Sequence, residues 1–418
     1  MTDTNPKRGQ APAGNQVMRD IMASSGVMIA LAVILALVIG AVLVTIFDPI
    51  FRETMTYFFS RPADAFIAAG MAAGGYFTSL FRGAIFDYEA LTFARGIRPL
   101  TETLTNSIPL IITGLAVGVG FRGGLFNIGA QGQFIVGAIA AGYVGFAFDL
   151  PPVIHLIAAI LAAIIAGSLW GAIVGLMKAK VRANEVIVTI MLNSIALYLL
   201  NFLLKTQTFI GEGFPGISLE VGPNATFPPM ITPMFRLHWG FLVAILATVA
   251  VWWIMERSTF GFELKAVGAN PEAARSSGMS VQRVIIVTML LSGGLAGLAA
   301  TAPTLGTEQF LTAGIAANYG FDAITVALLG RSRPLGTFLA GLLFGALNAG
   351  GSLMQAAANI PIDIVQVAQA TIVLLIAAPP LVRAIFRLPL PRDKRVMDTP
   401  APAAPAAPAA STSGGAQS

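Results

Sequence analysis

The feature that most constrains this chain is a run of mostly apolar residues without any charge, 26–47, which Asp20 and Asp48 bound. About 20 such residues suffice for a helix to cross the hydrocarbon core of a bilayer. The run is too long for the apolar region of a cleaved signal peptide, and no A-x-A cleavage site follows it. We therefore expect residues 26–47 to remain in the protein as its first transmembrane helix.

Apolar runs of similar length recur along the chain. Hydrophobic residues make up 56% of the sequence and charged residues 11%, against about 25% charged residues in a soluble globular protein. The sequence therefore predicts an all-α polytopic membrane protein. Its predicted transmembrane helices, about ten in number, lie at 26–47, 106–121, 130–149, 152–177, 185–204, 239–255, 285–304, 312–330, 334–354 and 361–382.

The distribution of basic residues predicts the orientation. With both termini cytoplasmic, eighteen of the 25 Lys and Arg residues fall in cytoplasmic segments, where such residues are enriched in membrane proteins. Residues 65–81 are apolar enough for an eleventh span. An extra crossing there would move all segments on one side of it to the opposite face of the membrane, and the predicted orientation would no longer agree with the distribution of Lys and Arg. We expect 48–105 to be an extracytoplasmic segment that is interfacial or partly helical, and whether 65–81 crosses the membrane or lies on it stays open.

This orientation divides the chain into three parts. Residues 1–25 form a cytoplasmic N-terminal segment, and 26–385 form the transmembrane domain. Within that domain, 205–238 is a second extracytoplasmic loop and 256–284 is a basic cytoplasmic loop. Residues 386–418 form a cytoplasmic tail that is first basic. From Thr399 it is rich in Pro, Ala and Ser without core-forming side chains, so we expect that part to be disordered.

Composition excludes several kinds of site. The chain has no cysteine and only two histidines, His155 and His238, so disulfides, thiolate metal sites and Cys nucleophiles are absent. No predicted span carries paired carboxylates or a nucleophile with its base, and we expect no catalytic residue, metal site or cofactor in this chain. The formal charge of +5 would favour nucleic acid in a soluble protein, but here it follows the membrane topology and we expect no nucleic acid partner.

The cytoplasmic loop contains a short helix with signals at both ends. Asn270 is a favourable N-cap, Pro271 suits the first helical position, and Glu272 places an anion in the first turn, where the helix dipole favours it. Gly278 suits the position just after the helix. The pattern predicts a helix over 271–277 on which a partner docks. An ordinary loop helix without a partner is the alternative that spacing alone leaves open.

A second segment, 122–133, interrupts two apolar stretches with glycines and amides. Irregular backbone at membrane depth needs protein or a water-filled cavity to satisfy it, and transporters use such breaks to present polar groups to a substrate. Close helix packing by the glycines is the alternative. Since polar residues inside spans are often functional, we assign Asn127, Gln131 and Asn193 to a substrate pathway as a hypothesis. For Asn193, an interhelical hydrogen bond is the alternative.

Other polar residues in or near the predicted spans receive structural assignments. Asp322 needs a partner or a cavity, and we expect a structural role at a helix end. Glu185 and Asp363 lie near span ends and are expected to be solvated, and His155 is expected at the membrane interface. The remaining candidates are Asn201, Asn348, Gln366 and Gln369.

The cytoplasmic loop also carries a family resemblance. Glu272, Ala273 and Ala274, followed after three residues by Gly278, match the EAA-x-x-x-G pattern of permeases of ATP-binding-cassette (ABC) importers. The surrounding sequence AVGANPEAARSSGMS resembles the version found in permeases for sugars and nucleosides. The resemblance implies that residues 271–278 form a coupling helix, with Asn270 at its start, that rests in a cleft of a cytoplasmic ATPase.

Three further stretches extend the resemblance over about residues 100–385. LIITGLAVGVGFRGGLFNIGAQGQ and ANEVIVTIMLNSIALYLLN resemble nucleoside-type ABC permeases, and YGFDAITVALLGRSRPLGTFLAGLLFGAL resembles a signature shared with sugar permeases such as those for ribose. The resemblance implies a permease subunit in the bacterial inner membrane that translocates nucleosides by alternating access. The amides of the proposed pathway would then bond ribose hydroxyls or base edges.

The resemblance also implies partners: a cytoplasmic ABC ATPase, a second permease subunit and an extracytoplasmic substrate-binding lipoprotein. None of the six lysines follows a glycine, so the chain has no P-loop, and ATP and Mg are expected on the partner ATPase. A monosaccharide permease, for ribose or a related sugar, is the first alternative. An ion-coupled secondary transporter is the second, and it would need ionisable residues deep in the spans, where only Asp322 is a candidate.

Overall fold

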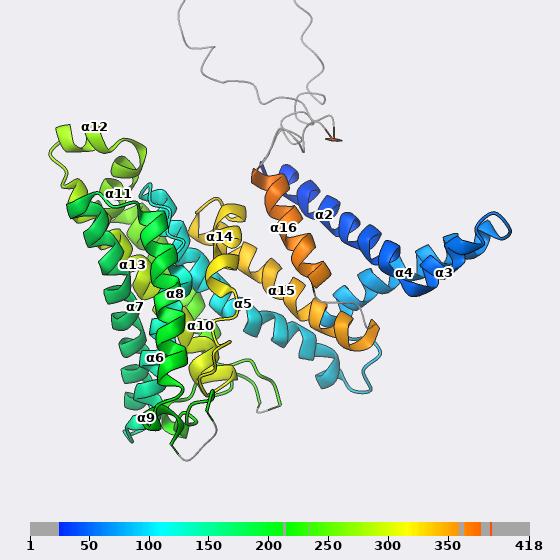
Figure 1. Ribbon diagram of the computed structural model, residues 1–418, viewed down its shortest axis with the longest axis horizontal. Coiled ribbons are helices and arrows are strands. Elements are labelled where there is room, and N and C mark those ends of the chain that lie inside the picture. The colour runs from blue at the N-terminus through cyan, green and yellow to red at the C-terminus, as the bar shows by residue number, and fades with distance from the viewer. Residues whose placement is uncertain (1–24, 212–214, 233, 359–362, 378–384, 387–418) are drawn as a thin grey trace, which may run out of the picture.

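The computed structural model describes residues 25–211, 215–232, 234–358, 363–377 and 385–386, and this part of the chain is built from helices (Figure 1). The helices are α2 (Ser25–Phe47), α3 (Pro49–Thr56), α4 (Pro62–Ala84), α5 (Phe93–Arg122), α6 (Ala130–Ala147), α7 (Ile154–Val181), α8 (Glu185–Leu203), α9 (Gln207–Ile210), α10 (Gly240–Arg257), α11 (Thr259–Ala269), α12 (Pro271–Ser276), α13 (Val281–Ala302), α14 (Tyr319–Leu329), α15 (Pro334–Ala358) and α16 (Asp363–Ala377). A 3₁₀ turn, η1 (Pro223–Ala225), and a π-helical turn, η2 (Pro303–Thr307), complete them. The predicted disordered tail and nearly all of the predicted N-terminal segment lie outside the described residues.

Eight helices in the described part of the chain are long and apolar enough to cross a membrane. They are α2, α5, α6, α7, α8, α10, α13 together with η2, and α15. In the same residues the extended pairings are two isolated bridges, Ile217 to Thr312 and Pro229 to His238. The all-α polytopic fold class predicted from the sequence is therefore confirmed.

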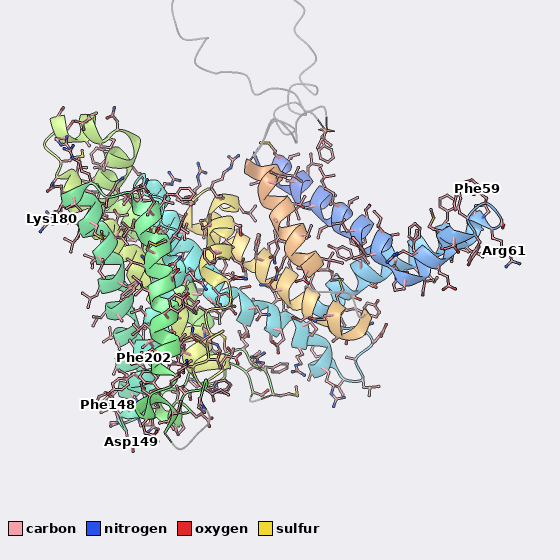
Figure 2. The ribbon with its side chains drawn as sticks, in the orientation of Figure 1. Phe59, Arg61, Phe148, Asp149, Lys180 and Phe202 are labelled. Atoms are coloured by element: carbon pink, nitrogen blue, oxygen red, sulfur yellow. The ribbon has the colours of Figure 1, made fainter. Side chains whose placement is uncertain are left out.

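The loops fall at two opposite ends of the helices. α12 and Lys180, near the end of α7, lie at one end, whereas Phe148, Asp149 and Phe202 lie at the other (Figures 1 and 2). The basic loop 256–284 and the loop 178–184 between α7 and α8, which the predicted orientation also places in the cytoplasm, thus share one end of the molecule. Which side of a membrane that end faces stays a prediction.

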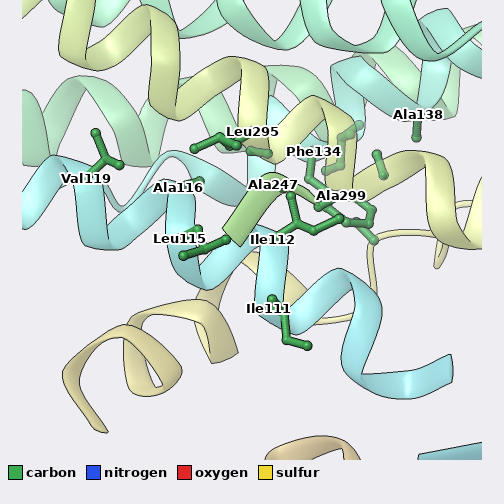
Figure 3. Close-up of a cluster of buried hydrophobic side chains, with 14 of the residues drawn as sticks. Ile111, Ile112, Leu115, Ala116, Val119, Phe134, Ala138, Ala247, Leu295 and Ala299 are labelled. Atoms are coloured by element: carbon green, nitrogen blue, oxygen red, sulfur yellow. The ribbon is translucent and has the colours of Figure 1, made fainter. Parts of the chain in front are cut away.

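The main core forms around α5, which is the most enclosed of the spans, with 83% of its apolar window buried. One face of α5 packs against α6, α10 and α13 (Figure 3). The residues in this contact include Ile112, Leu115, Ala116 and Val119 of α5, Phe134 and Ala138 of α6, Ala247 of α10, and Leu295 and Ala299 of α13. A second cluster joins α2, α4, α15 and α16 to the other side of α5 and to α14.

Glycines bring α7 and α13 into backbone contact. Small residues recur every four positions along α7, at Ala163, Gly167 and Gly171, and they face Gly293 and Gly297 of α13. A Cβ added at Gly293 would meet the carbonyl oxygen of Gly167, and one at Gly297 would meet that of Ala163. Small residues at this spacing allow close approach of helices in a membrane, so the many glycines of the sequence serve packing at this crossing.

The segment predicted as interfacial or partly helical, 48–105, is helical over most of its length. Asp48 caps α3 by accepting a hydrogen bond from the Phe51 amide at 2.8 Å. α4 has 23 residues and a length of about 34 Å, and it packs against α15 and α2. It is not among the eight helices of the described residues that are long and apolar enough to cross a membrane, and whether it crosses the membrane or lies on it stays open.

α5 begins at Phe93 rather than at residue 106, where the sequence placed the span. Thr92 caps the helix. Its first turns carry the charged residues Arg95, Arg98 and Glu102. Hydropathy excludes such residues from a predicted span, although they belong to the same helix. The apolar span is therefore the second half of a longer helix.

The structure also differs from the span predicted over 312–330. Residues 308–318 are irregular, and only Tyr319–Leu329 is helical. Gln309 and Ala317 have φ values of 63° and 37°, which a continuous helix does not contain. The hydropathy of these residues does not indicate the change from irregular to helical backbone.

Candidate coupling surface and pathway residues

The predicted loop helix is present as α12, over Pro271–Ser276. The side chain of Asn270 accepts hydrogen bonds from the amides of Glu272 at 3.0 Å and Ala273 at 3.1 Å. These two amides are among the first donors of the helix, which lack intrahelical partners. Asn270 therefore acts as the N-cap that the sequence predicts.

The other end of α12 closes with a Schellman motif. The amide of Met279 donates to the carbonyl of Ala274 at 3.0 Å, and that of Gly278 donates to Arg275 at 3.0 Å. Gly278 has φ = 83°, a conformation that glycine adopts without strain. Ala274 and Met279 pack together against the main core, so the helix is fixed to the protein by its last turn.

Nearly all of α12 is exposed. Ala274 is buried at 4% exposure, whereas Pro271, Glu272 and Ala273 are exposed. Glu272 pairs with Arg275 at 3.0 Å, and their side chains are 78% and 59% exposed. A helix that is closed at both ends, anchored by one alanine and otherwise open to solvent has the geometry of a docking element.

The loop that contains α12 packs against the turn between α5 and α6. A Cβ added at Gly268, at the end of α11, would meet the carbonyl oxygen of Arg122, and one added at Gly124 (φ = 71°) would lie 3.1 Å from Cα of Gly268. Leu264 of α11 packs against Gly123 of the same turn. A displacement of α12 would therefore reach this turn through backbone contacts.

Asn127 lies in that turn and is fully buried. Its Nδ2 donates to Gln133 Oε1 at 3.0 Å and to Ser292 Oγ at 2.8 Å, while its Oδ1 accepts from the Gly129 amide at 2.9 Å. Ser292 in turn donates to the carbonyl of Ala116 at 2.7 Å. The network ties the start of α6 to α5 and α13.

Gln131 and Asn193 hold the same end of α6. Gln131 donates to the carbonyl of Ala317 at 2.8 Å and accepts from the amide of Gly320 at 2.7 Å. Asn193 accepts from the amide of Gly132 at 2.8 Å and donates to the carbonyl of Ile128 at 3.0 Å. The first pair of bonds joins α6 to the start of α14, and the second joins it to α8.

The structure thus brings Asn127, Gln131 and Asn193 together around the first turn of α6. Each amide has protein partners for both its oxygen and its nitrogen in this conformation. These bonds give the three residues a structural role as helix connectors. Their role in a substrate pathway stays a prediction.

Sequence reasoning missed a polar cluster at the opposite end of the helices. Arg236 forms ion pairs with Glu102 of α5 at 3.8 Å and with Glu308, just after η2, at 3.4 Å. All three side chains are partly exposed, at 49%, 21% and 45%. The sequence feature that could have indicated this cluster is a single arginine, Arg236, in the long loop 205–238, which is otherwise poor in basic residues.

His238 lies beside this cluster, stacked on Phe227 with the ring centroids 5.2 Å apart. Its Nδ1 accepts a hydrogen bond from the Gly240 amide at 3.1 Å. Burial, assisted by the charge of Arg236, lowers the pKa of His238 to about 4, so its ring is neutral at pH 7. His238 and Phe227 line a cavity of about 330 Å³ at this end.

The remaining polar candidates have local partners. His155 is 1% exposed, with Nε2 2.9 Å from the carbonyl oxygen of Val144. Glu185, expected to be solvated, instead pairs with Lys178 at 2.6 Å and is only 14% exposed. The ion pair joins the end of α7 to the start of α8, a contact that the sequence alone does not indicate.

Asn201 bonds the carbonyl of Leu197 in its own helix at 2.9 Å, and Asn348 accepts from Gln369 at 2.8 Å. Gln366 and Asp363 are exposed. Within the ranges that the structure describes, no group of three or more His, Asp or Glu side chains has the arrangement of a metal site.

Comparison with known proteins matches residues 100–378 to the family described as branched-chain amino acid transport system / permease component. The guanosine ABC transporter permease protein NupP of Bacillus subtilis is 43% identical over 68% of this chain and 82% of its own length. The nucleoside ABC transporter permease protein NupB of Lactococcus lactis is 33% identical over 75% and 87%. The glucose ABC transporter permease protein TsgB13 of Haloferax volcanii is 38% identical over 75% and 84%.

Proposed function

Because this chain belongs to the branched-chain amino acid transport system / permease component family, we propose that it is the membrane-spanning subunit of a bacterial ABC importer for nucleosides. The observation that carries the substrate class is the similarity to guanosine and nucleoside permeases over most of their length. The chain supplies the translocation path and no ATPase site of its own. ATP and Mg bind to a partner ATPase.

The proposed complex contains a cytoplasmic ABC ATPase, a second permease subunit and an extracytoplasmic substrate-binding lipoprotein in the bacterial inner membrane. α12 is the contact to the ATPase, because it is exposed, closed at both ends and fixed to the core by Ala274. The residues of this contact are Asn270, Pro271, Glu272, Ala273, Ala274 and Gly278.

The contacts of α11 suggest how ATP-driven motion enters the membrane region. Closure of the ATPase dimer would displace α12, and Gly268 would pass the displacement to the turn after Arg122. That turn contains Asn127, whose bonds join α6 to α13. The helices would then alternate between outward- and inward-open arrangements.

The pathway hypothesis has its own test. If the amides of Asn127, Gln131 and Asn193 guide the substrate, a complex carrying all three as alanine transports more slowly than wild type. Transport at the wild-type rate by the triple variant would remove these residues from the pathway.

A sugar importer is the second candidate, since TsgB13 is a glucose permease of comparable similarity. The deciding experiment reconstitutes this chain with its ATPase, second permease and binding lipoprotein in liposomes, and measures uptake of radiolabelled guanosine and ribose with and without ATP. ATP-dependent guanosine uptake supports the proposal. Uptake of ribose alone would support the sugar candidate, and uptake indifferent to ATP would contradict the ABC assignment.

A further inference from the structure

α14 is too short to cross a membrane by itself. It has 11 residues and a length of about 16 Å, against about 30 Å for the hydrocarbon core. The residues before it, 308–318, are irregular. The chain therefore runs between the two ends of the molecule first as the irregular residues 308–318 and then as the helix α14.

Contacts with α5 and α6 fix the depth at which α14 starts. Near its far end, Arg122 Nε donates to the carbonyl of Ser332 at 3.1 Å, at the end of the molecule where α12 lies. At its start, the amide of Gly320 donates to Gln131 of α6 at 2.7 Å. The neighbouring Gly132 amide donates to Asn193, eight residues after α8 begins at the α12 end. Gln131 and the start of α14 therefore lie about 12 Å inside that end, and α14 runs toward it.

The irregular residues complete the passage toward the other end. Leu311 packs against Gly142 of α6, and its amide and carbonyl bond Ser218 of the long loop. Eleven residues of α6 separate Gln131 from Gly142, a rise of about 16 Å. The start of α14 is thus about 16 Å from the level of Leu311 at one end and about 16 Å, the length of α14, from the level of Ser332 at the other. It lies near the middle of the span.

Asp322 lies in this first turn of α14. Among the residues that the structure describes, its carboxylate has no ion pair and no hydrogen bond, and only its backbone amide and carbonyl are bonded, to Asn318 and Thr325. Asp322 is partly exposed, at the edge of a face on which Phe321 and Leu328 are 44% and 38% exposed. The opposite face, with Ala323, is buried against α5 and α6.

A carboxylate at this depth is costly in contact with lipid, and such residues face a protein partner or a water-filled cavity. Asp322 has no partner for its carboxylate in the described chain, which leaves the second permease subunit or water, and an aqueous pathway supplies the water. Broken helices near the middle of the membrane are also where transporters place substrate sites. A carboxylate accepts hydrogen bonds from hydroxyl groups, which both nucleosides and sugars carry.

We propose that Asp322 lines the aqueous translocation pathway and accepts hydrogen bonds from the hydroxyl groups of the passing substrate. This inference rests on the proposed function as an importer of a hydroxyl-rich solute. It does not depend on whether that solute is a nucleoside or a sugar.

Cysteine reactivity tests the first half of the proposal, since the chain contains no native cysteine. Asp322→Cys is compared with two controls in the assembled complex in nanodiscs: Ala323→Cys, at a side chain that is 0% exposed, and Leu169→Cys, at the middle of α7, where the side chain is 61% exposed. The probe is a charged methanethiosulfonate, read out on the tagged chain. Asp322→Cys should react at least tenfold faster than both controls.

Transport tests the second half. Asp322→Asn keeps the shape of the side chain and one acceptor oxygen but removes the charge, and exchanging a charged for a neutral hydrogen-bond acceptor should raise KM about fivefold to tenfold. Assembly with the ATPase, measured by pull-down, should stay unchanged. A merely structural role would lower assembly or stability and leave KM in place.

Two results would overturn the proposal. Asp322→Cys reacting as slowly as Leu169→Cys would remove the residue from the aqueous pathway, and an unchanged KM in Asp322→Asn would remove it from contact with substrate. Failure of the proposed function is distinguishable. In that case the wild-type complex takes up neither guanosine nor ribose, while the cysteine reactivity still reports whether water reaches Asp322.

Discussion

The crossing of α7 and α13 at Gly167 gives a quantitative prediction for Gly167→Ala. The added Cβ would meet the carbonyl oxygen of Gly293 and would lie 2.9 Å from Cα and 3.0 Å from N of Gly297. All three are backbone atoms, which cannot rotate away as a side chain can. The two helices must therefore move apart.

The magnitude follows from these distances. Carbon atoms in favourable contact are about 3.5–4.0 Å apart, so the helices must separate by roughly 0.6–1 Å, and such a gap forfeits a quarter to a half of each contact's attraction. Overpacking of this kind costs about 1–3 kcal/mol, and the better helix propensity of alanine offsets about 1 kcal/mol. We expect the free energy of unfolding to fall by up to about 2 kcal/mol.

The matched control is Gly74→Ala in α4, where nothing lies within 4 Å of the added Cβ. There only helix propensity acts, and the variant should be neutral or more stable by up to about 1 kcal/mol. Both are measured by reversible unfolding of the purified chain in mixed detergent and sodium dodecyl sulfate. Equal stability of the two variants would refute the backbone contact between α7 and α13.

Three further predictions concern local contacts. Asn270→Ala removes the acceptor for two amides of α12 at a cost of about 1 kcal/mol; hydrogen exchange over residues 271–276 should quicken, and unchanged exchange would contradict the cap. The pKa of His238 is about 4 in the folded protein and 6.5 ordinarily, so protonation favours the unfolded state. The free energy of unfolding is full above pH 6.5, falls as the pH drops toward 4, and is lower by about 2 kcal/mol at pH 5. His238→Asn, which keeps an acceptor for the Gly240 amide, should flatten that profile of unfolding free energy against pH, and an equal slope would be the contrary result. Gln131→Ala leaves the Gly320 amide without its acceptor and should cost about 1–3 kcal/mol of unfolding free energy, whereas the exposed control Gln366→Ala should cost nothing; equal losses would count against the bond.

Local chemistry explains which features could be predicted from the sequence. The cap at Asn270 and the left-handed position at Gly278 depend on residues within one turn, and both occur where the pattern predicts them. The spans follow from runs of apolar residues, which record burial or lipid contact directly. The irregular passage at 308–318 was not predicted, because its residues are about as apolar as those of a continuous helix.

Partners distant in the sequence could not be predicted. Gln131 was selected for its amide in a broken segment, but its partner Gly320 is 189 positions away. Asn193 likewise bonds Gly132, 61 positions away. The sequence thus indicates which side chains require partners, and only the packing of α6 against α8 and α14 supplies them.

The measurement that tests the central claim most directly is ATP-dependent uptake by complexes that carry Glu272→Arg or Glu53→Arg. Glu272 is 78% exposed on α12, and its reversal puts a second positive charge beside Arg275 on the proposed contact with the ATPase. Glu53 is also exposed but lies on α3, far from α12 (Figure 1).

We predict that Glu272→Arg lowers ATP-dependent guanosine uptake at least tenfold and weakens recovery of the ATPase in a pull-down, while Glu53→Arg behaves as wild type. Wild-type uptake by Glu272→Arg, with the ATPase still bound, would contradict the coupling role of α12.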